Sequence, residues 1–505
     1  MLKTAIVVPP ASFFRASPFP VLGPAILKTF LDSNDYKTDF IDLSVRISYL
    51  NRFRMRKIFN LKLFHDVENL TNFLEKGKSE AIKKEVKKFI ALGNLTNYDV
   101  IGFTLSSIDH IIFSLCIAKV LKEEYNKNIV LGGPITSRSD YSDLLNFDFV
   151  DFLVVGDGEE PFLKILNFFN NSGRAKNHDG ICYKKNGKIH TSKPSIFPLE
   201  KKSIPSFNAE DLELYNKLRT MKLSILPYLL SRGCKFKCAF CCEYRNSFFQ
   251  YMPLEKVISD VRTLLKVYSA NSIFFAEANM NNDPEYLQNL SKRILSERLK
   301  FSWGGQATIS GLDENTIKLM ARAGCQYVIV GLESASESVR NRMHLNKSGD
   351  LENFKETLKL LHKYNIRVHN FFIVEFPHET DEEFKENVNF LSENANYLTT
   401  AFGDNFGLLE SSTIFSAPKA FNIQIRKRNN SRFNFLNRGW KFDDVGGLNW
   451  EEKRRGGNIK RMLINKMIYR KLRLRLMFHS IFTHPSYILR KVIYQRYSNY
   501  DEYFL

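Results

Sequence analysis

Four cysteines lie within nine residues of this 505-residue chain, close enough for their thiols to act together in one chemical site. They belong to the segment Ser231-Arg-Gly-Cys234-Lys-Phe-Lys-Cys238-Ala-Phe-Cys241-Cys242. The other three cysteines, at positions 116, 182 and 325, are scattered, and this is not the pattern of a disulfide framework. In a reducing compartment, such a cluster indicates metal binding or redox chemistry.

Three of these thiols, from Cys234, Cys238 and Cys241, have the spacing Cys-x3-Cys-x2-Cys. A [4Fe–4S] cluster takes thiolate ligands, normally one for each iron. Three ligands from one loop would leave one iron open to chelate the amino and carboxylate groups of S-adenosylmethionine (SAM). Two alternatives stay open: Cys242 could replace Cys241 as the third ligand, or the loop could hold a structural zinc with a fourth ligand.

The elements that position this loop are predicted from alternating strand and helix patterns. Short apolar runs such as Ala5–Val8 and Val100–Thr104 alternate with helical patterns, which predicts a Rossmann-like, doubly wound parallel sheet. The Asn186-Gly187 turn predicts a hairpin around it. From Ser224 to about residue 395, five or six further strand–helix units predict a partial β/α barrel, with the cysteine loop directly after its first strand.

The predicted α/β organisation has three parts: residues 1–200, the barrel at 216–400, and a basic, mainly helical region at 401–505. The net charge is +19, with 44% hydrophobic and 25% charged residues, as in an ordinary globular protein. Between Arg426 and Glu502 there are 19 Lys and Arg against 6 Asp and Glu. The N-terminal apolar run is too short for a signal peptide, and no apolar stretch of about 18 residues suggests a membrane span, so we expect a cytoplasmic protein.

Residues 223–395 resemble the radical SAM superfamily, and Phe240 matches the aromatic residue that this family usually has before its last cysteine. The resemblance implies an enzyme with a [4Fe–4S] cluster that cleaves SAM reductively to a 5′-deoxyadenosyl radical. It also implies an electron donor such as a flavodoxin or ferredoxin as a partner.

The same resemblance implies contacts to SAM. Glu277 ends the second barrel strand and would bind the amino group, although relatives often have two adjacent acids there. Gln306 follows the third strand and would reach the ribose or the carboxylate. The stretch Val330-Gly-Leu-Glu333-Ser334 resembles the fourth-strand motif, so that Glu333 and Ser334 would face the nucleoside. Helix capping is the alternative role for either acid.

Relatives have glycine at the positions of Glu375 and His378, in the segment Phe372-Ile-Val-Glu-Phe-Pro-His-Glu-Thr380. These two large side chains are expected to point towards the barrel mouth. They would be either substrate contacts or tolerated loop residues, and the sequence does not decide between these roles.

Residues 1–200 resemble the cobalamin-binding domain of one large radical subclass. The matching segments are Pro18–Pro24, Asp99–Gly102, Leu131–Pro134 and Gly156–Glu159. Gly132 and Gly133 would let the backbone approach a flat ligand, and Thr104, Ser106 and Ser107 would hydrogen-bond its nucleotide tail. The Asp-x-His-x-x-Gly motif that gives cobalt a histidine is absent, and no histidine precedes His65. A Rossmann-like sheet without cobalamin remains the alternative.

The combined resemblance implies cobalamin-dependent methyl transfer to an unactivated atom of a small-molecule, lipid or peptide substrate; the sequence assigns no catalytic residue. Two other functions stay open: a cobalamin-independent radical enzyme that modifies nucleic acid or a metabolite, and a non-enzymatic metal-binding protein. The basic C-terminal clusters, interleaved with Phe, Tyr and Leu, fit nucleic acid, an anionic membrane surface or a solvated helix face.

Overall fold

A computed structural model describes residues 2–11, 19–53, 58–171, 178–218, 224–243, 249–345, 349–427, 433–436 and 440–480. Parts of the predicted segments lie outside these ranges, among them Pro18 of the first cobalamin-type segment, and residues 428–432, 437–439 and 481–505 of the basic C-terminal region. Among the helices that are described, none combines the length and the apolar character that a membrane crossing requires.

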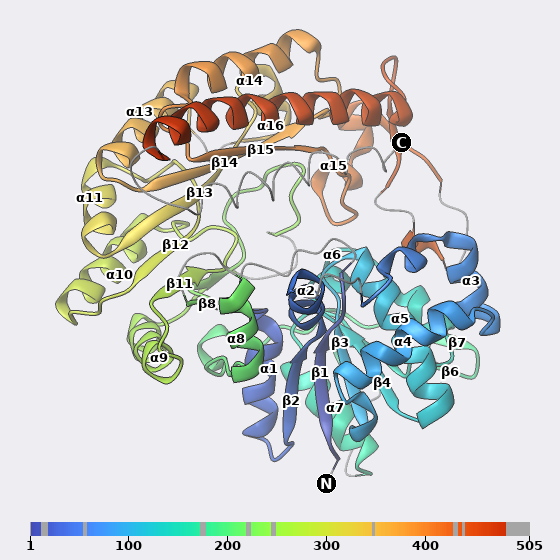
Figure 1. Ribbon diagram of the computed structural model, residues 1–505. Coiled ribbons are helices and arrows are strands. Elements are labelled where there is room, and N and C mark those ends of the chain that lie inside the picture. The colour runs from blue at the N-terminus through green and yellow to red at the C-terminus, as the bar shows by residue number, and fades with distance from the viewer. Residues whose placement is uncertain are drawn as a thin grey trace.

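The N-terminal domain is built on a seven-stranded sheet with the order β2-β1-β3-β4-β5-β6-β7 (Figure 1). The strands are β1 Thr4–Val8, β2 Thr38–Asp42, β3 Val100–Thr104, β4 Asn128–Gly132, β5 Phe152–Val154, β6 Ile181–Lys185 and β7 Lys188–His190. Strands β1 to β5 are parallel, and β6 and β7 add the predicted hairpin in antiparallel pairing. The strand order reverses between β1 and β3, which is where such sheets bind ligands.

Helices cover both faces of this sheet. They are α1 Leu22–Asp32, α2 Leu43–Phe53, α3 Val67–Lys76, α4 Glu80–Leu92, α5 Ile108–Tyr125, α6 Pro134–Arg138, α7 Glu159–Phe169 and α8 Ala209–Leu218. Successive strand residues pack on opposite layers, so Ile6 contacts the α1 and α7 side, whereas Ala5 and Val7 contact the side of α3 to α5. The structure therefore confirms the prediction of a doubly wound sheet.

A second, curved sheet of six parallel strands has the order β15-β14-β13-β12-β11-β8. The strands are β8 Ile225–Tyr228, β11 Ser272–Phe275, β12 Ser302–Ala307, β13 Cys325–Glu333, β14 Arg367–Val374 and β15 Thr400–Asn405. Its helices are α9 Leu254–Val267, α10 Pro284–Ser296, α11 Glu314–Arg322, α12 Glu337–Arg342, α13 Leu351–Lys363 and α14 Asp381–Asn394. Most of these helices lie outside the curve (Figure 1), and together with the strands they form the partial barrel that the sequence predicts.

The two faces of the curved sheet differ in what covers them. On β14, Val368, Phe372 and Val374 are buried in the core shared with the outer helices. His369 and Phe371 alternate with them, and therefore lie on the opposite, concave face.

The C-terminal region consists of α15 Thr413–Ser416, the antiparallel pair β16 Ile423–Ile425 and β17 Phe442–Asp444, and the long helix α16 Trp450–Ser480. Helix α16 runs along β15 and against α14 (Figure 1). It turns Lys453, Gly457, Lys460 and Ile464 inward, at the three- and four-residue spacing of one helix face.

Candidate active site

The cysteine loop follows β8 and is anchored at several points. Its start forms β9, Ser231–Arg232, which pairs with β10, Gln250–Tyr251. The amide of Cys241 donates to the carbonyl of Cys238 at 3.1 Å, and the amide of Ala239 donates to the carbonyl of Met343 at 2.9 Å. Cys238 is buried, whereas Cys234 and Cys241 are partly exposed. The chain thus holds the three predicted ligands in one compact loop.

The protein environment alone does not ionise the thiol of Cys241. Burial raises the pKa of the Cys241 thiol to about 12, although the amide of Glu243 donates to its sulfur at 3.5 Å. Metal binding would have to displace this proton. Within the described residues, no three His, Cys, Asp or Glu side chains stand where they would hold one metal ion. The ligands of a four-iron cluster bind different irons, so they lie further apart than those of one zinc.

Glu277 lies beyond the end of β11, next to the start of the cysteine loop. Its side chain is buried, and one carboxylate oxygen, Oε2, accepts a hydrogen bond from the amide of Leu230 at 3.1 Å. Among the residues that the structure describes, none hydrogen-bonds to the other oxygen, Oε1. Burial raises the pKa of this carboxyl to about 8. Buried polar atoms are normally paired, so an orphaned acceptor here fits the ammonium group of SAM.

Gln306 and Glu333 lie on neighbouring strands of the curved sheet. Gln306 is exposed and pairs in register with Ile329 of β13. Glu333 ends β13 after a shift of register, and its φ of 64° lies in the left-handed region, which is uncommon for a residue with a Cβ. The side-chain oxygen of Asn370 accepts from the amide of Leu332 at 3.1 Å and stabilises this irregularity.

Ser334 is fully buried and takes part in a different set of contacts. Its hydroxyl lies 3.4 Å from Oδ1 of Asn387 on α14 and accepts from the amide of Ser336 at 3.2 Å. The structure therefore directs this hydroxyl towards α14, and the predicted contact of Ser334 with the nucleoside stays a prediction.

A cavity of about 390 Å³ lies between the first sheet, helices α1 and α7, and the cysteine loop. Apolar residues of the sheet and both helices line it, namely Ile6, Ile26, Leu27, Val130, Val154 and Phe162. The cavity is also lined by Thr104, Gly132 and Gly133, which lie at or next to strand ends as predicted. Arg232 and Cys242 line it from the cysteine loop. One cavity therefore touches both the N-terminal domain and the loop.

Two glycines of the cavity wall allow close packing behind it. A Cβ on Gly102 would lie 2.8 Å from the ring of Phe162, and one on Gly133, whose φ is 119°, would lie 2.6 Å from the amide of Leu105. Ser106 is not among the lining residues, since its hydroxyl lies 2.9 Å from Nδ1 of His110. An apolar crevice with glycines at its edge fits an elongated ligand that carries an aromatic tail, as cobalamin does.

An ion-pair network that the sequence analysis missed joins the two domains beside the cavity. Arg232 donates to Oδ2 of Asp157 at 2.6 Å and to the carbonyl of Phe197 at 2.8 Å. Lys202 lies 3.5 Å from Oδ1 of Asp157 and pairs with Glu159. The only sequence signal was the position of Arg232, two residues before the first cysteine.

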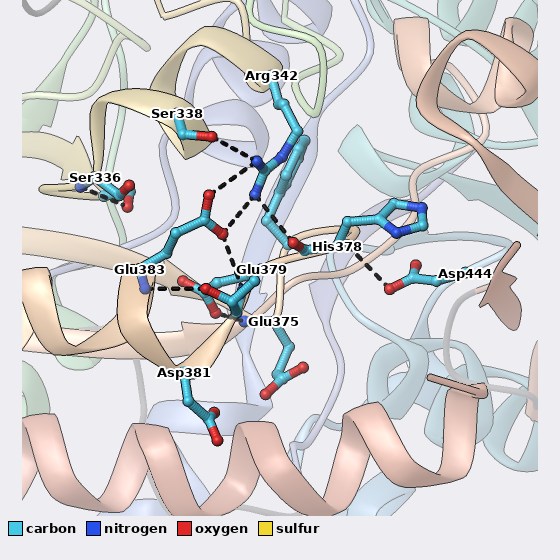
Figure 2. A network of polar contacts seen from close by, with 12 residues as sticks. Ser336, Ser338, Arg342, Glu375, His378, Glu379, Asp381, Glu383 and Asp444 are labelled. Atoms are coloured by element: carbon cyan, nitrogen blue, oxygen red, sulfur yellow. Dashed lines mark hydrogen bonds and ion pairs between the residues drawn. The ribbon is translucent and has the colours of Figure 1, made fainter. Parts of the chain in front are cut away.

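The turn after β14 belongs to a polar network shown in Figure 2. Oε2 of Glu379 accepts from the amide of Glu375 at 2.6 Å, and Arg342 pairs with Glu383 at 2.9 Å. Glu375 and His378 both have a φ of 59°, the conformation that glycine adopts most easily.

These two large side chains bind the C-terminal region. Oε1 of Glu375 lies 2.8 Å from Nζ of Lys460 on α16, and Nε2 of His378 lies 2.9 Å from the carbonyl of Asn422. The structure thus gives both side chains partners in the C-terminal region, and their orientation towards the barrel mouth stays a prediction.

Comparison with known proteins agrees with this arrangement. Residues 228–391 match the family model described as the radical SAM superfamily. The chain is 26% identical over 335 residues to an uncharacterized methyltransferase of Pyrococcus horikoshii, covering 65% of this chain and 69% of that protein. It is 24% identical over 317 residues to bacteriochlorophyllide d C-8(2)-methyltransferase of Chlorobaculum tepidum, covering 59% and 64%.

Two solved structures share the fold across most of the chain. The radical SAM methyltransferase TsrM of Kitasatospora setae, with cobalamin and a [4Fe–4S] cluster bound, has a TM-score of 0.63 at 14% identity and covers 92% of this chain and 89% of its own. The cobalamin-dependent radical enzyme OxsB, with aqua-cobalamin bound, has a TM-score of 0.58 at 16% identity and covers 87% and 57%.

The family match spans most of the curved sheet and the loop whose geometry is given above, so residues 228–391 form a radical SAM domain. Such a domain implies an enzyme that uses SAM and a [4Fe–4S] cluster. Within the superfamily, the chain has the fold of the subclass with an N-terminal cobalamin-binding-type domain, to which TsrM and OxsB belong.

Proposed function

We propose that this chain is a cobalamin-dependent radical SAM methyltransferase that acts on an unactivated atom of its substrate. The observation that carries the proposal is the cavity that the N-terminal domain shares with the cysteine loop. The methyltransferase names of the relatives support the reaction class. When bound, the cluster supplies the electron that cleaves SAM to a 5′-deoxyadenosyl radical, and cobalamin carries the methyl group.

Different residues in and around the cysteine loop would bind the cluster and orient SAM. Cys234, Cys238 and Cys241 would hold the cluster and leave one iron open for SAM. Glu277 accepts hydrogen bonds from the SAM ammonium group through its orphaned oxygen, and it must lose its proton to do so. Gln306 lies on the concave face of the curved sheet, where the substrate would bind.

The cavity of the N-terminal domain would hold cobalamin without a histidine from the missing motif. Its apolar lining excludes water from an aromatic tail, and Gly132, Gly133 and Thr104 face the ligand at the strand ends. Arg232 and Cys242 contribute the side of the cavity nearest the cluster ligands. Both cofactors would then contact one loop of the chain.

The substrate that fits the proposal is a small molecule, and the electron donor is a flavodoxin- or ferredoxin-type protein. Named relatives act on bacteriochlorophyllide d and on a cytidylyl phosphonate, the latter a protein of Streptomyces wedmorensis. One TsrM structure contains a tryptophan substrate. These are substrates of those proteins, and each of them contains a ring system.

Anaerobic reconstitution of the full-length protein tests the proposal. We expect about four irons and four sulfides per chain, a corrin spectrum after incubation with cobalamin, and SAM-dependent formation of 5′-deoxyadenosine. A Cys238→Ala variant should lose the iron and the 5′-deoxyadenosine. A Cys182→Ala variant, which removes a buried thiol of β6, should keep both.

Two results would contradict the proposal at different levels. Zinc without inorganic sulfide in anaerobically prepared protein would overturn the cluster assignment. Full turnover by protein that contains no corrin would overturn the role of cobalamin, while the radical SAM assignment would stand.

A further inference from the structure

Two aromatic rings lie side by side and exposed on the concave face of the curved sheet. Phe371 of β14 and Phe402 of β15 are paired in register, and their ring centroids are 5.7 Å apart at an interplanar angle of 31°. Their side chains are 41% and 39% exposed. Although the sequence holds 43 phenylalanines, these two are the ones that stand among the exposed large apolar residues of the described chain.

The exposure is a property of the face and not of strand ends. The residues that alternate with the pair, such as Phe372 and Gly403, are buried against the outer helices and α16. A soluble protein rarely leaves neighbouring large apolar side chains in water unless they form a binding surface. The concave face therefore has the character of a binding surface.

On the neighbouring strands, residues that are paired in register across the sheet continue the same surface. Tyr327 of β13 leans over Gly304, where a Cβ would lie 2.8 Å from its ring. Tyr327 also meets the ring of His369 edge-on, with centroids 5.9 Å apart. In the next row, the register places Gln306, Ile329, His369 and Thr400 side by side.

His369 adds a hydrogen-bonding group to this surface, in the same row as Gln306 and Thr400. Its Nδ1 lies 2.8 Å from the hydroxyl of Thr400, which leaves Nε2 as the ring nitrogen that can meet a ligand. Burial lowers the pKa of the imidazole, so it is neutral at neutral pH and offers a single hydrogen bond.

The N-terminal domain reaches the other side of the same face. Phe19, from the segment before α1, stacks on Phe274 of β11 with centroids 4.3 Å apart and an interplanar angle of 25°. Phe274 pairs in register with Gly304 and therefore shares the face of Tyr327. Aromatic rings thus border the concave face at both of its sides.

We propose that this concave face binds a planar aromatic or conjugated ring system of the substrate, with Phe371 and Phe402 as its platform and His369 as its hydrogen-bonding partner. The inference rests on the proposed function, whose substrate it places beside Gln306. Ring faces and edges select for flat π systems, because aromatic pairs gain energy beyond the area they bury. An aliphatic chain would gain only the buried area.

The test uses full-length reconstituted protein and the fluorescent probe N-phenyl-1-naphthylamine, which is neutral and aromatic. Phe371→Leu and Phe402→Leu keep an apolar side chain but remove a ring, and each should weaken probe binding about three- to tenfold. Tyr125→Leu, which removes a similarly exposed ring from α5, should leave it unchanged. Naphthalene should displace the probe at lower concentration than dodecanol.

Unchanged probe binding in both phenylalanine variants, or equal displacement by dodecanol, would overturn the proposal. Formation of 5′-deoxyadenosine is measured on the same samples. Its absence from every variant and from the wild type would contradict the proposed function, whereas the probe result would still decide what the concave face binds.

Discussion

The carboxylate of Glu277 is the side chain whose replacement tests the SAM site most directly. A Glu277→Gln substitution keeps the size of the side chain and its acceptor for the amide of Leu230, but removes the charge. The orphaned Oε1 is then replaced by an amide group that cannot accept from an ammonium group as a carboxylate does. We expect weaker SAM binding without loss of the fold.

The size of the effect follows from the kind of hydrogen bond that is lost. A hydrogen bond to a charged group contributes about 1.5–3 kcal/mol, which corresponds to an increase of about ten- to hundredfold in the Kd for SAM. Glu314→Gln on α11 removes an exposed carboxylate that pairs with Lys363, and serves as the matched control. Its Kd for SAM should stay that of the wild type.

The pH dependence gives a second, independent readout. With a pKa of about 8, the carboxyl of Glu277 is protonated at pH 7 in the ligand-free protein, so SAM binding releases a proton. Affinity should therefore rise with pH between about 6 and 8, by up to about tenfold per unit, and level off above that range. The Gln variant should show no such rise.

Stability should change in the opposite direction. Because the pKa of Glu277 is raised in the folded state, its contribution to stability is present below about pH 4.5 and is lost as the pH rises to about 8. The ligand-free Gln variant should therefore gain Tm relative to the wild type at pH 8. Isothermal titration at several pH values and thermal unfolding measure both effects, and equal SAM affinity of the two proteins would refute the assigned role.

Two further predictions concern ion pairs. Lys460→Met leaves Glu375 buried without a cation and should lower the free energy of unfolding by about 3–5 kcal/mol, as measured with urea. Adding Glu375→Gly should recover much of this loss, because glycine suits a φ of 59°; no recovery would contradict the account. Arg232→Gln breaks the contact with Asp157 and should weaken corrin retention several-fold after gel filtration, without changing the iron content; unaltered retention would speak against it.

Much of the fold could be predicted because its signals are local. The apolar runs of β1 and β3 and the Asn186-Gly187 turn each lie within a few residues, and they have the predicted structure. The cysteine loop was equally clear, since the spacing of Cys234, Cys238 and Cys241 is itself the signal.

The features that sequence reasoning missed depend on residues far apart in the chain. Glu375 meets Lys460 from 85 positions away, and nothing near either residue indicates the pairing. Likewise, the sequence of β14 shows that its side chains alternate between the two faces of the sheet, but it does not show which face the helices cover. Phe371 and Phe372 look equivalent in sequence, and only the placement of α13 and α14 leaves one of them exposed.

The position of α16 has a consequence for shortened forms of this chain. β15 is the outermost strand of an open sheet, and Asn465 of the helix accepts from its Gly403 amide at 3.4 Å. A chain truncated before Trp450 would expose that strand to pairing with other molecules, and it would lack the cation that pairs with Glu375. Precipitation of such a truncated protein would therefore indicate that the edge strand β15 has lost the helix that covers it. Failure of that protein to bind nucleic acid or lipid would not show whether the removed basic residues bind them.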